Sequence, residues 1–154
     1  FRDRRLIQFL QRPAEYTHAV FSTALDPNVF VLRLVPGMRA DIIPLLAPHY
    51  RALVLESFGV GGLPGGEHGE MFAALRRWCE SGRLAVFTTQ VPHEGCDLAV
   101  YEVGRAVGEL SGVLEARDMT PEAVAVKLMW ALGQTEDREK AARLFETPIE
   151  YDIM

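Results

Sequence analysis

The sequence has no apolar run that approaches the roughly 20 residues of a membrane-spanning helix, and no stretch typical of a signal peptide. Its two cysteines, Cys79 and Cys96, lie far apart and form no Cys-x-x-Cys pair, which favours reduced thiols in a cytoplasmic protein over a disulfide framework. The formal net charge of -5 argues against a general affinity for nucleic acid. With 49% hydrophobic and 24% charged residues, the composition is typical of one globular domain.

Three signatures of catalysis or nucleotide binding are incomplete in this chain. A Walker A loop needs a Gly-Lys pair, and the sequence has none. The dinucleotide fingerprint that Gly59 and Gly61 would begin has Pro64 in place of its third glycine. Leu55 stands where a nucleophile elbow around Ser57 would need a glycine. Nucleotide binding and serine hydrolysis are therefore disfavoured.

The sequence also offers no complete metal site or acid–base pair. No two histidines stand at metal-ligand spacing, and each is interpreted as a surface residue or one satisfied by the fold: His18, His49, His68 and His93. Glu94, Asp97 and Glu102 keep an acid–base role open. Carboxylates so close in sequence are more often solvated or capping, and Asp97 is expected to cap the helix that follows it.

Three apolar segments predict parallel strands, over Val29–Val35, Ala52–Glu56 and Leu84–Thr89. Helical segments over 40–47 and about 66–80 separate them. Strands that alternate with helices at this spacing form right-handed βαβ units. The expected fold is therefore a three-layer α/β domain, with a mainly parallel, flavodoxin- or Rossmann-like sheet and helices on both faces.

The second half of the chain is expected to be helical. Thr120 has the position of an N-cap, and Gly133 is expected to end the helix that follows. Thr135 is expected to cap the last helix. The predicted helices cover 97–107, 121–132 and a segment from Thr135 to about Glu146.

The segment Ala52–Gly66 runs from a buried strand straight into a turn crowded with glycines: Gly59, Gly61, Gly62, Gly65 and Gly66. Ligands of open α/β sheets bind at the carboxyl ends of strands, and glycine lets the main chain approach a partner closely. A tight strand-to-helix turn without a ligand explains the same residues. The residues alone support a parallel α/β domain with a turn that can accept a ligand, and no complete catalytic set.

Four stretches of the chain carry a series of motifs: Val31–Ile43, Ala52–Pro64, Val86–Arg105 and Asp118–Gly133. They contain, in this order, a strand into Pro-Gly, a strand into Gly-x-Gly, a Thr-Gln after the third strand with a Tyr-x-x-Gly helix, and Asp-Met-Thr before a Lys-Leu helix. Together they resemble the C-terminal domain of the bacterial type I (cytoplasmic) L-asparaginases of the asparaginase/glutaminase family. Each motif is weak alone, and their shared order carries the resemblance.

The resemblance implies a two-domain enzyme that hydrolyses the side-chain amide of asparagine to aspartate and ammonia, with no metal or organic cofactor. Its nucleophile is a threonine of the N-terminal domain, whose Thr-Gly-Gly-Thr opening does not occur here. The chain begins at Phe1 in what reads as mid-element. We therefore expect residues 1–28 to be a linker and first edge segment, and 29–154 the C-terminal domain. This chain alone is expected to be inactive, and the whole enzyme a homodimer or homotetramer.

The resemblance also assigns candidate site residues. The family's Gly-x-Gly turn reaches the active site of the neighbouring subunit, and many members place an asparagine directly after it. Gly61 and Gly62 hold these positions here, so backbone must replace a side-chain contact. Other members bring a glutamate from the stretch after the third strand, for which Glu102, beside Tyr101, is the nearest candidate.

Some type I enzymes also bind asparagine at an effector site, through an arginine before the glycine turn and a cysteine after Thr-Gln. Glu56 and Val91 occupy these two positions here, next to Thr89 and Gln90. A carboxylate repels the effector's carboxylate, whereas an arginine would pair with it bidentately. The hypothesis is that this protein lacks that control.

Two alternatives stay open. Residues Val126–Gly133 and the Tyr101-x-x-Gly104-Arg105 pattern also fit the amidase subunit of an archaeal-type glutamyl-tRNA amidotransferase. A non-enzymatic α/β module that binds a small molecule would equally lack the nucleophile. The preference for asparagine or glutamine cannot be assigned, because its determinants belong mostly to the N-terminal domain.

Overall fold

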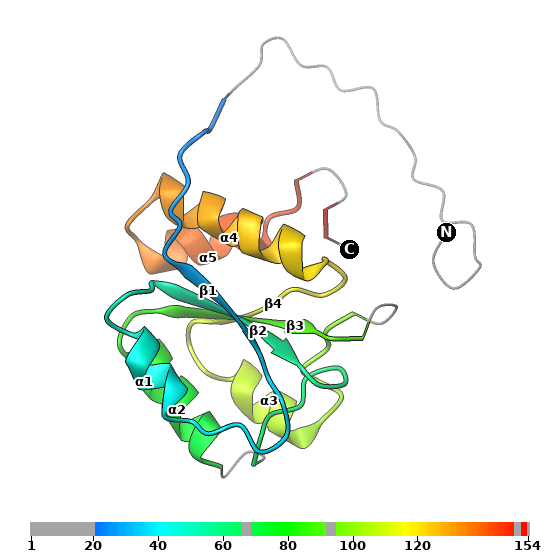
Figure 1. The fold of residues 1–154 in the computed structure, drawn as a ribbon. Coiled ribbons are helices and arrows are strands. Elements are labelled where there is room, and N and C mark those ends of the chain that lie inside the picture. Colours follow the sequence, from blue (N-terminus) through cyan, green and yellow to red (C-terminus); the bar gives the residue numbers. More distant parts are fainter. Residues whose placement is uncertain (1–20, 66–68, 92–94, 150–151, 154) are drawn as a thin grey trace, which may run out of the picture.

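The computed structural model describes residues 21–65, 69–91, 95–149 and 152–153. Its sheet has four parallel strands in the order β1-β2-β3-β4, which is also their order along the chain (Figure 1). The strands are β1 (Val29–Arg33), β2 (Ala52–Ser57), β3 (Leu84–Thr89) and β4 (Val113–Glu115). In register, Ala52 lies beside Val29 on one side and Leu84 on the other. The three predicted strands are confirmed: β3 has the predicted bounds, β1 ends two residues earlier than predicted and β2 ends one residue later.

Helices cover both faces of this sheet, as the sequence predicts (Figure 1). Right-handed crossovers between sequential strands put the connecting helices on the same face. These are α1 (Ile42–Leu46), α2 (Glu70–Glu80) and α3 (Glu102–Gly108), while α4 (Pro121–Gln134) and α5 (Arg138–Glu146) cover the other face. The three-layer α/β architecture is therefore confirmed.

Each helical layer packs against its own face of the strands. Leu53 and Leu55 of β2 join the core beneath α1 and α2, whereas Val54 between them joins the core beneath α4 and α5. All three side chains are fully buried. A strand buried on both faces needs such a continuous apolar run, which is why β2 is conspicuous in the sequence.

The predicted N-cap at Thr120 is confirmed by a hydrogen bond, and α2 also ends at a glycine. The hydroxyl of Thr120 accepts a hydrogen bond from the N–H of Ala123 and caps α4. Gly82, directly after α2 and its C-cap Ser81, has φ +86°, which is the left-handed conformation of a helix stop. Gly66 and His68, near the predicted start of α2, lie outside the described residues, and α2 itself begins at Glu70.

Two predicted caps are wrong. The helix expected from Asp97 begins only at Glu102, and the carboxylate of Asp97 instead accepts the N–H of Ala99 at 2.9 Å. Asp137, not Thr135, caps α5, since its carboxylate accepts the N–H of Lys140 at 2.8 Å. In both places the carboxylate or hydroxyl bonds two or three residues ahead, and the sequence alone does not say which turn continues as a helix.

The predicted stop at Gly133 is also wrong, because α4 continues through Gln134. A β-carbon on Gly133 would lie 2.5 Å from the carbonyl oxygen of Ala24. This glycine therefore permits close packing and does not end the helix.

None of the helices in the described part of the chain has the length and apolar character needed to cross a membrane. The sequential strand order also means that the described sheet has no point at which its winding reverses, the usual ligand crevice of α/β sheets. Any site at the carboxyl edge must therefore be built by the loops that follow the strands.

Candidate functional site

The glycine turn after β2 is a tight loop in which Gly62 has no room for a side chain. Its N–H donates to the carbonyl oxygen of Phe58 at 2.9 Å, closing a bridge between the two residues. A β-carbon on Gly62 would lie 2.6 Å from the Phe58 ring and 2.8 Å from the Phe58 oxygen. The asparagine that the family resemblance leads us to expect at this position does not fit this turn unless Phe58 and its backbone move.

The turn is tied to the loops that follow the next two strands. The hydroxyl of Thr89 donates to the carbonyl oxygen of Gly59, and the carbonyl of Val60 accepts the N–H of Asp97 at 3.0 Å. The N–H of Cys96 in turn donates to the carbonyl oxygen of Arg117 at 2.7 Å. The loops after β2, β3 and β4 thus form one connected surface at the carboxyl edge of the sheet.

Tyr101 contributes to this surface, whereas Glu102 does not contact it. The Tyr101 hydroxyl would lie 3.6 Å from a β-carbon on Gly59, and the residue is 47% exposed. The Glu102 side chain is exposed and makes no hydrogen bond or ion pair with the other described residues. Gly104 explains the Tyr-x-x-Gly spacing, since a β-carbon there would lie 2.4 Å from the carbonyl oxygen of Leu98 and push α3 and Tyr101 away.

The four positions that match the effector site of the resembled family are Glu56, Thr89, Gln90 and Val91. They lie close together, and most of their polar side-chain groups form hydrogen bonds within the domain. The side-chain amide of Gln90 donates to the carbonyl oxygens of Leu34 at 2.6 Å and Glu56 at 2.8 Å, so it joins the ends of three strands. The Thr89 hydroxyl, besides its bond to Gly59, accepts the N–H of Val91 at 3.0 Å. Thr89 and Gln90 therefore have few polar groups left for a ligand.

An arginine to which no sequence motif assigns a role faces these residues. Arg33, at the end of β1, donates from Nε to the side-chain oxygen of Gln90 at 3.2 Å. Its Nη1 lies 3.8 Å from the carboxylate of Glu56, whose side chain is 17% exposed. The strand register places Arg33 directly beside Glu56, so a predicted register would have found the pair. The negative charge of Glu56 is thus offset by a neighbour.

No hydroxyl or thiol of this edge is an activated nucleophile within the described residues. Ser57 is buried and donates to the carbonyl oxygen of Thr88 at 2.8 Å, so it has no basic partner. Burial raises the pKa of Cys96 to about 12, and Glu115 and Asp97 add to the rise, while burial raises the pKa of Cys79 to about 11. Both thiols are therefore protonated and unreactive at neutral pH.

The comparison with known proteins decides the family. Residues 28–145 match the Glutaminase/Asparaginase C-terminal domain. The chain belongs to this family. It is 40% identical to an L-asparaginase of Thermococcus kodakarensis over 134 residues, which are 87% of this chain and 40% of that protein. It is 38% identical to a subunit of the glutamyl-tRNA(Gln) amidotransferase of Metallosphaera sedula, over 79% of this chain and 27% of that protein.

Solved structures agree with this family assignment. The thermostable L-asparaginase from Thermococcus kodakarensis superposes with a TM-score of 0.82 and 37% identity, over 94% of this chain and 43% of that one. L-asparaginase I from Vibrio cholerae superposes with a TM-score of 0.73 and 27% identity, over 84% and 38%. The chain therefore spans less than half the length of the relatives that it matches.

A cavity of about 430 Å³ lies at the opposite, amino-terminal edge of this asparaginase-family domain. Three arginines line it: Arg83 and Arg138 bind the carbonyl ends of helices, while Arg51 pairs with the carboxylates of Asp26 and Glu136. Arg83 donates to Ala47 at 2.7 Å and Arg138 to Cys79 at 3.0 Å. Arginines here offset the unpaired carbonyls and the negative end of each helix dipole, which accounts for the cavity as part of the fold.

Metal binding finds no support in the described part of the domain, where no three His, Cys, Asp or Glu side chains gather to hold an ion. His18, His68, His93 and Glu94 lie outside the described residues, so their predicted roles are untested. The structure thus brings together Gly61, Gly62 and Tyr101 at one edge, adds Arg33, and leaves Glu102 apart.

Proposed function

We propose that this chain is the C-terminal domain of a cytoplasmic type I L-asparaginase, which hydrolyses asparagine to aspartate and ammonia. The carboxyl edge supports this proposal best. Gly59 of the turn and Tyr101 are exposed and form a surface for a partner, while none of the described hydroxyls or thiols of this edge is activated. A nucleophile must then come from elsewhere, as in a two-domain amidohydrolase whose catalytic threonine precedes this domain.

In this proposal the domain works in a homodimer or homotetramer, and its glycine turn contributes to the neighbouring subunit's pocket. Gly61 and Gly62 contribute backbone, because the packing of Phe58 leaves no space for a side chain on Gly62. The Tyr101 hydroxyl beside the turn is a hydrogen-bonding group for substrate or for the partner's loop. Glu102 is exposed and lies apart from the turn of its own subunit, so in this proposal it reaches an active site only in the assembled oligomer.

We further propose that the enzyme lacks allosteric control by asparagine. Glu56 places a carboxylate where the effector's own carboxylate would need a cation. The side chains of Thr89 and Gln90 are already occupied by hydrogen bonds within the domain. Arg33, the neighbouring cation, already contacts both Glu56 and Gln90.

The amidase subunit of a glutamyl-tRNA amidotransferase is the second candidate, favoured by the identity to the Metallosphaera protein. Ammonia release from asparagine and glutamine by the whole protein, with and without tRNA and a partner protein, separates the two candidates. Activity on free asparagine alone supports the asparaginase. Activity that requires tRNA and a partner supports the amidotransferase. No ammonia under either condition would refute both and leave a non-enzymatic binding module.

A further inference from the structure

Residues 21–26 form an extended arm that crosses α4 before the chain enters β1 (Figure 1). Three hydrogen bonds join the arm to one stretch of α4, and together they are called the clasp. The indole N–H of Trp130 donates to the carbonyl oxygen of Ser22 at 3.1 Å, and the side-chain amide of Gln134 donates to that of Ala24 at 2.8 Å. The N–H of Asp26 donates to the carbonyl oxygen of Met129 at 2.9 Å.

Gly133 makes the close approach of the arm possible. Glycine inside a helix costs about 1 kcal/mol relative to alanine, so helix stability does not explain its presence in α4. A β-carbon at this position would lie 2.5 Å from the oxygen of Ala24 and 2.9 Å from the α-carbon of Leu25. Both are main-chain atoms, so an alanine could be accepted only if the arm moved as a whole.

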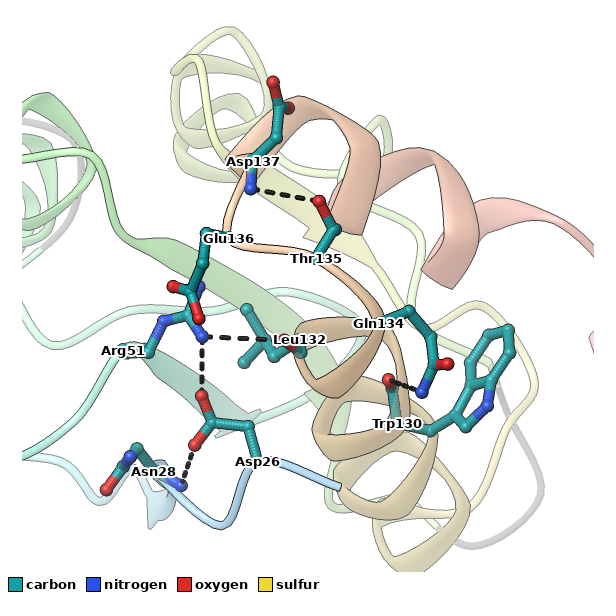
Figure 2. A network of polar contacts seen from close by, with 9 residues as sticks. All are labelled: Asp26, Asn28, Arg51, Trp130, Leu132, Gln134, Thr135, Glu136 and Asp137. Atoms are coloured by element: carbon teal, nitrogen blue, oxygen red, sulfur yellow. Dashed lines mark hydrogen bonds and ion pairs between the residues drawn. The ribbon is translucent and has the colours of Figure 1, made fainter. Parts of the chain in front are cut away.

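A charged network holds the end of the arm nearest to β1. Figure 2 shows Arg51 between Asp26 and Glu136. Its Nη1 lies 2.6 Å from the Asp26 carboxylate, and its Nη2 lies 3.0 Å from that of Glu136 in the loop between α4 and α5. The other oxygen of Asp26 accepts the N–H of Asn28 at 2.9 Å. The arm is therefore fixed both along α4 and at its exit into the sheet.

We propose that this surface of α4 is a binding site for an extended polypeptide segment, recognised through its backbone, and that the arm occupies it so that the chain enters the domain along one fixed path. The donors on Trp130 and Gln134 bind carbonyl oxygens two residues apart, which point the same way in an extended chain. The side chains of Phe21 and Leu25 are 85% and 59% exposed, so their identity is not recognised.

The clasp has a consequence for catalysis that rests on the proposed function. If the preceding chain carries the nucleophile, then Gly133, Trp130 and Gln134 are positioning residues for it, because they set where that chain joins this domain. The hydrogen bonds of the clasp do not depend on which reaction the protein catalyses.

Amide hydrogen exchange, followed by NMR on the 154-residue protein, tests the clasp. Gly133→Ala should lower the protection of the Asp26 N–H on the order of tenfold or more, because the arm must leave α4. It should also shift the indole N–H resonance of Trp130, which loses its partner. Gly108→Ala is the matched control: it also replaces a helical glycine, and its β-carbon would meet only the Leu98 side chain at 3.7 Å. Unchanged exchange and indole signals in Gly133→Ala would overturn the proposal.

Two further variants test the clasp without introducing a steric overlap between α4 and the arm. Trp130→Phe and Gln134→Met each remove one donor without adding bulk, and each should lower Asp26 protection while the β2 amides stay protected. Protection equal to wild type in both would contradict the clasp. In the whole protein, Gly133→Ala should lower kcat for asparagine more than Gly108→Ala does. If the wild-type protein released no ammonia, the proposed function would fail and the exchange result would still decide the clasp.

Discussion

At the scale of single residues, most polar side chains of the carboxyl edge form hydrogen bonds that connect strands and loops, and Thr88 is an exception. The hydroxyl of Thr88 is fully buried and has no hydrogen-bond partner among the described residues, whereas Ser57 beside it donates to the Thr88 carbonyl. An unpaired buried hydroxyl costs about 1–3 kcal/mol, while an apolar group of the same shape costs nothing comparable.

Thr88→Val should therefore raise the free energy of unfolding by about 1 kcal/mol, measured by urea denaturation. Ser57→Ala is the companion variant and should lower it by a similar amount, because it removes a hydrogen bond. A loss of stability in Thr88→Val would show that the hydroxyl has a partner in solution.

Gly62 is the second residue whose replacement has a definite expected result. Gly62→Asn should destabilise the protein by about 1–3 kcal/mol, since the new side chain overlaps the Phe58 ring and its backbone oxygen. Thermal unfolding monitored by circular dichroism measures this loss. A stability equal to wild type would contradict this overlap and mean that Phe58 readily moves aside.

At the scale of elements, α4 holds both the arm and the end of the chain. Lys127 on α4 is almost fully buried, and its ammonium group contacts the Asp152 carboxylate at 2.7 Å and the carbonyl oxygen of Thr147 at 2.9 Å. Lys127→Met should cost about 1–3 kcal/mol of unfolding free energy, because the partly exposed Asp152 carboxylate loses its ion pair and keeps the hydrogen bond from the N–H of Ile149. Asp152→Asn in the same background should recover part of this loss, and additive losses in the double variant would contradict a direct pair.

The arm should respond to acid through Asp26. Burial alone would raise the pKa of Asp26, but the N–H of Asn28 and the Arg51 guanidinium outweigh it and hold the pKa below its ordinary value. A lowered carboxylate pKa stabilises the fold above the ordinary pKa, about 4, and this contribution is lost as pH falls through the folded-state value. Asp26→Asn should therefore weaken stability at pH 7 and flatten its fall below about pH 4, in urea titrations at several pH values. An unchanged acid profile would contradict the role given to Asp26.

The elements also show where sequence patterns stop being informative. The three long strands are predictable, because each is a mostly apolar, β-branched run, and β2 and β3 are buried along almost their whole length. β4 has only three residues and is recognisable only from its partner β3, since its local sequence follows two glycines and resembles a loop. The start of α3 depends on Gly104 packing against Leu98, a tertiary contact that overrides the local capping pattern at Asp97.

At the scale of the whole molecule, the order of motifs predicts the family well, while the site depends on register. Gly61, Gly62 and Tyr101 meet at one edge because consecutive parallel strands end there. The Arg33–Glu56 contact can be predicted only when the register between β1 and β2 is known, and the sequence alone does not give this register. The fold and family are therefore predictable from the chain, and the polar contacts between strands are not.

The Arg33–Glu56–Gln90 contacts give a kinetic prediction for the whole enzyme. Initial rates against asparagine concentration should follow a hyperbola with a Hill coefficient near one, because the described residues around Glu56 hold no free cation for an effector's carboxylate. Glu56→Gln should leave the curve hyperbolic. A sigmoidal curve that becomes hyperbolic in a Thr89 or Gln90 variant would contradict the absence of control.

The central claim is that this domain completes an asparagine amidohydrolase whose nucleophile lies elsewhere. Ammonia release from free asparagine, measured on the 154-residue chain and on the whole protein side by side, tests it most directly. We predict release by the whole protein without tRNA, a metal or a cofactor, and none by the 154-residue chain. Release by the chain alone, or none by the whole protein, would contradict the claim.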